Sequence, residues 1–147
     1  MKPMTRWTAA LLVVWASVLT AQDVKVLTVE DHDRAMKAIL GHSRVVLKLL
    51  DAGDLQEMKR NYLGIRDQLV GVRGFWEMKK NDDAVTMVTT AIAKAEGIVA
   101  AVDAKADRPT IDARIKELVD SCGACHAKFR EPDPATPGSH VIKEGIL

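Results

Sequence analysis

Apolar residues recur at alternating spacings of three and four along most of the chain, between about residues 28 and 130. This spacing follows the 3.6-residue turn of an α-helix, so each run predicts an amphipathic helix with one apolar face. Polar or glycine-containing breaks divide the pattern into four helices, which we expect at about residues 28–52, 55–74, 82–102 and 109–129. Apart from a brief run at 24–27, no strand alternation is present, so the pattern predicts an all-α fold.

The expected helix ends follow from residues that favour or stop a helix. Thr28 can cap the first helix, Asp82 can cap the third, and Gly53 ends the first. Pro109 suits the first turn of the fourth helix, where its missing N–H costs no hydrogen bond. Glycines weaken the end of the second helix, and we expect residues 75–81 to connect it to the third. Four amphipathic helices joined by short loops predict an antiparallel four-helix bundle.

Residues 1–21 have the pattern of a secretory signal peptide. Lys2 and Arg6 precede an uncharged, mostly apolar stretch at residues 7–21, which ends in a plausible cleavage motif. An uncleaved membrane anchor is the alternative, but this stretch is shorter than the roughly 20 residues that a bilayer span needs. We therefore expect export to the periplasm, cleavage near Gln22 and no stable membrane span in the mature chain.

The rest of the chain divides into a helical domain at residues 22–131 and a tail at residues 132–147. The tail holds three of the five prolines, which predicts an extended, flexible segment. Without the signal segment the chain has 19 basic and 20 acidic residues. No basic face large enough to bind nucleic acid emerges from this balance, so we expect no nucleic-acid partner.

The only two cysteines stand in a C-x-x-C-H motif formed by Cys122, Cys125 and His126. Residues three apart on a helix share a face, so both sulfurs can bond the two vinyl groups of one porphyrin. His126 then presents its imidazole to the iron from the same side. A disulfide here would close a tiny loop, a thioredoxin-like pair would need a βαβ setting, and zinc would need a second ligand pair. We therefore expect one covalent haem c per chain, with His126 as the proximal iron ligand.

A C-x-x-C-H motif near the end of the fourth helix of a small exported bundle resembles the cytochrome c′ family, the class II c-type cytochromes. The resemblance includes Phe129 and Arg130, because the family usually follows its haem histidine with an aromatic residue and then arginine. It implies a haem packed among the helices, with Arg130 near it. A solvated charge at a helix C-terminus explains Arg130 equally well. Family members commonly end soon after the motif, so the tail is a departure and its role is open.

The group on the other side of the iron decides the function that this resemblance implies. Low-spin members supply a methionine and carry electrons, and Met36 falls where they place it. Typical members leave this side without a protein ligand and bind small gases. His32, one turn before Met36, is a further candidate, whereas His42 points elsewhere. We rank Met36 first, an open site second and His32 third, and the alternative for Met36 is that it fills core space.

Two functions therefore stay open. The first is a periplasmic electron carrier that docks with a redox partner protein, and the second is a gas-binding protein for NO or CO with an open sixth coordination site. An enzyme has little support, because no acid–base pair stands beside the motif. Pairing of two chains into a homodimer, common in the family, is left open.

Overall fold

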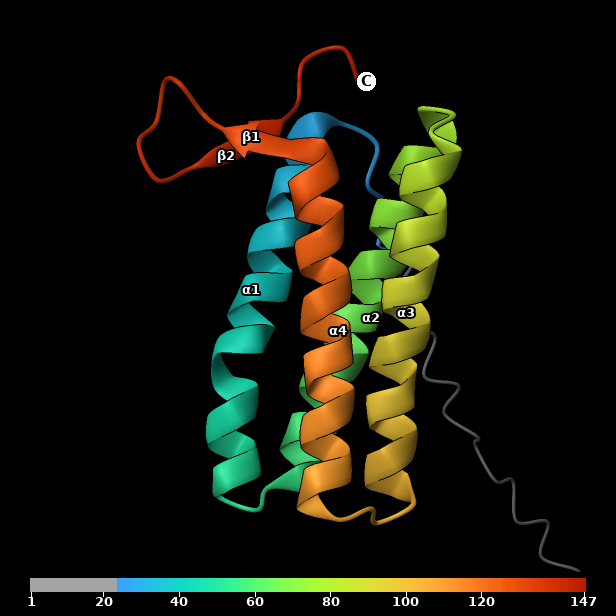
Figure 1. The fold of residues 1–147 in the computed structure, drawn as a ribbon, viewed down its shortest axis with the longest axis vertical. Helices are drawn as coiled ribbons and strands as arrows, with labels where there is room; N and C mark the ends of the chain where they lie inside the picture. Colours follow the sequence, from blue (N-terminus) through green and yellow to red (C-terminus); the bar gives the residue numbers. More distant parts are fainter. Residues whose placement is uncertain (1–23) are drawn as a thin grey trace, which may run out of the picture.

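Four long helices run side by side along the length of the molecule (Figure 1). The computed structural model describes residues 24–147, so the expected signal peptide lies outside the described residues. The helices are α1 (Val29–Asp51), α2 (Leu55–Met78), α3 (Asp82–Asp103) and α4 (Arg108–Phe129), and two short strands follow, β1 (Arg130–Pro132) and β2 (His140–Ile142). The helical prediction is confirmed, and the arrangement is compatible with a four-helix bundle.

The helix starts are set by side chains that accept hydrogen bonds from free backbone N–H groups. Thr28 caps α1 reciprocally with Asp31: the Asp31 N–H donates to Thr28 Oγ1 at 3.1 Å and the Thr28 N–H to Asp31 Oδ2 at 3.2 Å. The predicted cap of α3 was one residue off, because Asn81 caps this helix by accepting from the Ala84 N–H at 3.0 Å. Asp107 caps α4 and precedes its proline.

α2 runs four residues beyond the end predicted from its glycines, so the expected connection at residues 75–81 was wrong. Phe75 and Trp76 are almost completely buried in that last turn. Burying a large apolar side chain contributes about 1.5–3 kcal/mol, whereas each helical glycine costs about 1 kcal/mol relative to alanine. Tertiary burial of two aromatic rings therefore outweighs the local cost of Gly74.

Gly71 of α2 has a packing role that the sequence pattern did not reveal. A Cβ atom at this position would lie 2.5 Å from the Val24 carbonyl oxygen and 2.9 Å from Val26 Cγ2. The segment that leads into α1 therefore crosses α2 at a point where only a glycine leaves room. Val26 is buried there as part of the core.

The expected flexible tail is instead a short hairpin, which corrects the prediction. β1 continues directly from α4 and pairs antiparallel with β2, so that Arg130 lies opposite Ile142 and Pro132 opposite His140. The two further prolines of the tail fall in the loop between the strands, where no ladder hydrogen bond is needed. The Lys143 N–H donates to the Phe129 carbonyl at 2.9 Å, which satisfies one of the free carbonyls at the end of α4.

The helices that follow each other in sequence pack closely. α1 packs on α2, α2 on α3 and α3 on α4, whereas α1 and α4 make few close backbone contacts. α3 is long and apolar enough to cross a membrane by length and composition, the one such helix in the described part of the chain. Packed between α2 and α4, it has the composition of a core helix. The core of buried apolar side chains lies mainly along α2 and α3.

Candidate functional site

An ion pair joins α1 to α4 and fixes which sides of the two helices meet; the strip between these sides is called the seam. The Arg108 guanidinium at the start of α4 lies 2.9 Å from Asp51 Oδ1 at the end of α1. Residues spaced by three, four or seven positions share one side of a helix. On α1, the side that holds Asp51 also holds Leu47, Leu40 and Met36. On α4, the side that holds Arg108 also holds Ile115, Val119, Cys122 and His126.

The seam is lined by apolar side chains that no other helix covers. Leu40, Leu47 and Val119 are 49%, 54% and 61% exposed. Single exposed apolar side chains are ordinary on a protein surface, but these three lie on the sides of α1 and α4 that the ion pair joins. Each would contribute free energy of burial if an apolar group covered it.

The C-x-x-C-H motif occupies the end of α4 that borders this seam. Cys122 and Cys125 are free, half-buried and packed against the core. Burial raises the pKa of both thiols, so they are neutral at pH 7. Burial lowers the pKa of the His126 imidazole, and the nearby Arg130 and His140 lower it further. A neutral imidazole beside two thiols on one helix side is the donor set that a covalently attached haem needs.

Helix geometry indicates which α1 side chain lies opposite this motif. Measured from the Asp51–Arg108 ion pair at 1.5 Å per residue, His126 lies roughly 27 Å along α4, level with about residue 33 of α1. Side chains lean towards the N-terminus of their own helix. Those of the two antiparallel helices therefore lean in opposite directions, which brings Met36 towards the level of His126; His32, one turn before Met36, also lies near His126. Met36 is half-buried and packs against the core.

His32 lies in an aromatic environment near the same end of the bundle. Its ring centroid is 5.1 Å from that of Phe75 and 5.6 Å from that of Trp76. His32 Nε2 is buried and has no hydrogen-bond partner among the described residues. Burial, with a smaller contribution from the nearby His126, lowers the pKa of His32 to about 4. A neutral ring with an unused nitrogen is consistent with a missing polar partner or iron atom at this position.

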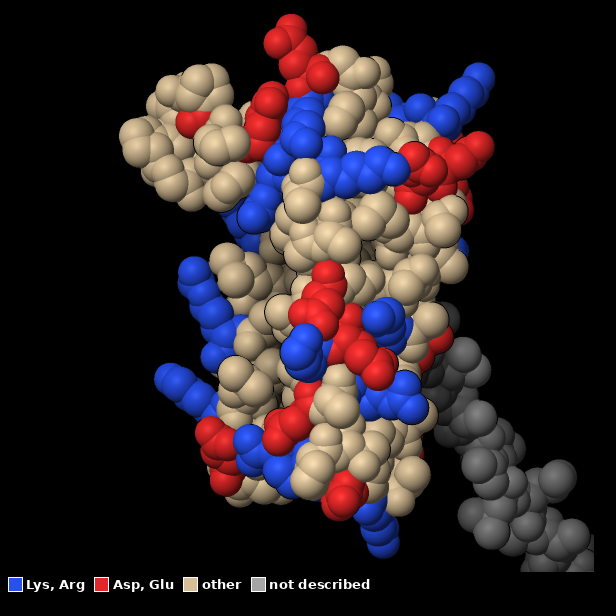
Figure 2. All heavy atoms as spheres, in the orientation of Figure 1, with Lys and Arg blue, Asp and Glu red and all other residues tan. Residues whose placement is uncertain are grey.

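A hollow of about 330 Å³ opens beside His126, between α4 and the C-terminal hairpin. Its lining comprises Gly123, His126, Ala127, Arg130, Pro132 and His140. Figure 2 shows Lys and Arg side chains gathered where α4 meets the hairpin, and Lys128, Arg130 and Lys143 belong to this region. Arg130 therefore lies beside the motif, towards solvent rather than in the core.

Sequence reasoning did not single out His140. It lies on β2, in the segment that the prolines marked as a flexible tail. The only signal for a strand there is the pair Val141 and Ile142, two β-branched residues, which is too short to predict a strand. The pairing with β1 that places His140 beside the motif is a tertiary feature.

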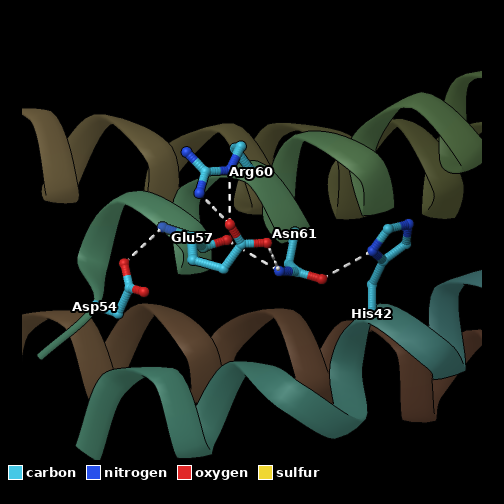
Figure 3. A network of polar contacts seen from close by, with 5 residues as sticks. All are labelled: His42, Asp54, Glu57, Arg60 and Asn61. Carbon is cyan, nitrogen blue, oxygen red and sulfur yellow. Dashed lines mark hydrogen bonds and ion pairs between the residues drawn. The ribbon is translucent and has the colours of Figure 1, made fainter. Parts of the chain in front are cut away.

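A separate polar cluster joins α1 to α2 away from the seam (Figure 3). Asn61 Nδ2 donates to the Glu57 carbonyl at 2.9 Å, which leaves the Asn61 amide oxygen to accept from His42 Nδ1 at 2.9 Å. A Cβ atom on Gly64 would lie 2.6 Å from His42 Nε2. His42 is therefore held against α2, away from the motif, and its role is structural.

Comparison with known proteins finds no relative: no family model, no curated protein and no solved structure matches this chain. The site is thus characterised by its own residues. It combines two half-buried thiols and a neutral imidazole on α4, exposed apolar side chains along the seam, and a thioether and a second imidazole on the facing helix.

Proposed function

We propose that this chain is a periplasmic c-type cytochrome that binds one haem covalently and transfers single electrons. The observation that carries the proposal is the placement of Cys122, Cys125 and His126, all half-buried within little more than one turn of α4 beside the seam. The donor set fits a haem, because the porphyrin supplies four of the iron ligands and the protein needs to supply at most two.

Each residue of the motif has a defined part in this proposal. The thiols of Cys122 and Cys125 would hold the haem by adding across its two vinyl groups. Each addition would break the S–H bond and the vinyl π bond and form one C–S and one C–H bond, so no oxidant would be needed. His126 would bind the iron through its neutral imidazole. When bound, the haem supplies reversible one-electron chemistry at its iron.

Met36 is our first candidate for the second axial ligand. Its level on α1 and the tilt of its side chain bring it towards His126. A thioether ligand stabilises ferrous iron and raises the reduction potential, which suits a carrier that must accept an electron readily. His32 is the alternative ligand, because its buried Nε2 has no hydrogen-bond partner among the described residues and its ring lies near His126.

The second candidate function is gas binding at an open coordination site. It is supported by the separation of α1 from α4, since a helix that stands off can leave the distal side of the iron without a ligand. NO or CO would then bind directly to the iron. The two functions differ in the iron's spin state and in access to the iron.

Absorption spectroscopy of the purified holoprotein separates these functions. For the carrier we expect a low-spin ferric spectrum with a weak far-red sulfur-to-iron band, reversible one-electron reduction, and slow or no CO uptake by the reduced protein. A high-spin spectrum with rapid CO uptake would reject the carrier and favour the gas-binding protein. A protein that carries no haem after maturation would reject both.

A further inference from the structure

We propose that the C-terminal hairpin completes the haem site, with Arg130 and His140 holding the carboxylate edge of the haem in the hollow beside His126. The proposal rests on the function proposed above. It gives the segment after the motif a ligand-binding role, with the haem carboxylates as the bound chemistry.

The hairpin is firmly attached to the end of α4. Besides the bond from its backbone N–H to Phe129, Lys143 donates from Nζ to the Ala127 carbonyl at 2.9 Å. The Glu144 N–H donates to Glu131 Oε1 at 3.2 Å. Ile142 packs against the core. His140 is therefore carried by a strand whose position is fixed relative to the motif.

The attachment points set the direction in which the porphyrin extends. On a haem, the two carboxylate side chains lie on the edge opposite the two vinyl groups. The vinyl edge is tied to Cys122 and Cys125, and the iron is held by His126. At about 100° per residue, the order around α4 is Cys125, Cys122, His126, then Arg130 and Gly123. The carboxylate edge therefore extends past His126 towards the side of α4 that lines the hollow.

The hollow offers what carboxylates need. Arg130 forms no ion pair with any described residue, so its guanidinium is available for a two-pronged contact with a carboxylate. Gly123 and Ala127 are small and leave space beside it. Arg130 and His140 both line the hollow together with His126.

Two acidic side chains at this end are engaged with other groups. Asp83 binds Lys128 at 2.5 Å on the α3 side of α4, and Glu131 accepts from the hairpin backbone. The lining of the hollow holds Arg130 and no carboxylate, so its charge favours an anionic group.

Resonance Raman spectroscopy of the full holoprotein tests the proposal, because the bending vibrations of the haem carboxylates shift when their hydrogen bonds are lost. We expect a shift in Arg130→Gln and in His140→Ala, with recovery in His140→Gln, which keeps a donor. Val141→Ala perturbs the neighbouring, exposed position of the same strand. Lys128→Gln removes one positive charge from the same helix end on the α3 side. Neither control should shift the vibrations.

The outcomes separate the two proposals. A pyridine haemochrome assay on each variant reports covalent haem, so its absence in the parent protein would defeat the proposed function itself. Covalent haem with unchanged carboxylate vibrations in both Arg130→Gln and His140→Ala would overturn the hairpin's role alone. Equal shifts in Val141→Ala and His140→Ala would also overturn it, because the hairpin would then act only as a structural cap.

Discussion

Replacing Gly64 by alanine should destabilise the protein, although alanine is the better helix former. The change alone would contribute about 1 kcal/mol of stability through helix propensity. The new Cβ atom would lie 2.6 Å from His42 Nε2 and 2.7 Å from His42 Cε1, so the ring must turn away. Turning breaks its 2.9 Å hydrogen bond to Asn61 and leaves a half-buried amide oxygen without a partner. The lost hydrogen bond costs about 1–3 kcal/mol of stability, and displaced packing adds to this cost. After the gain in helix propensity is subtracted, we expect the free energy of unfolding to fall by about 1–2 kcal/mol.

Urea denaturation followed by helical circular dichroism measures this change. Gly74→Ala on the same helix is the matched control, because nothing lies within 4 Å of its new Cβ atom and it should stabilise the protein by up to about 1 kcal/mol. In a His42→Ala background the Gly64→Ala change should lose its penalty. Stabilisation by Gly64→Ala in the parent protein would refute the packing that we describe between His42 and α2.

Three further changes test other parts of the account. Met36→Ala should convert a low-spin ferric spectrum to high-spin and remove the far-red band; an unchanged spectrum would transfer ligation to His32. Gly71→Ala should destabilise the protein by about 1–3 kcal/mol in urea denaturation, because the segment of Val24 and Val26 must move away from the new Cβ atom. Unchanged stability would contradict the close packing of this segment on α2. In the chain expressed without haem, the unfolded state takes up a proton at His32 near pH 6.5, but the folded state only near pH 4. The free energy of unfolding should therefore fall by up to about 3 kcal/mol as the pH drops through this range. His32→Leu should remove that part of the pH dependence when the free energy of unfolding is measured by urea titration at several pH values. An unchanged dependence of this free energy on pH would contradict the burial of the His32 ring.

Local signals predicted most helix starts and the shared helix of the three motif residues, because both depend on residues close in sequence. The capping residue Thr28 and the early Pro109 act within one turn of the helix that they start. The three motif residues share one side of α4 because a helix repeats every 3.6 residues. Such features require no knowledge of the rest of the fold.

The errors came from contacts between distant segments. α2 extends past Gly74 because the rings of Phe75 and Trp76 are buried by other helices, which its own glycines cannot indicate. The tail forms a hairpin because Lys143 and Ile142 find partners at the end of α4, outside the range of any local pattern. His140 was missed for the same reason.

Intact-mass spectrometry of the protein exported to the periplasm, in cells that mature c-type cytochromes, tests the central claim most directly. We predict the mass of a chain that begins near Gln22 plus one haem, with the haem retained after denaturation. The double variant Cys122→Ser, Cys125→Ser should have the mass of the chain without covalent haem. A parent protein whose mass corresponds to the chain alone, in cells that attach haem to a control cytochrome, would contradict the account.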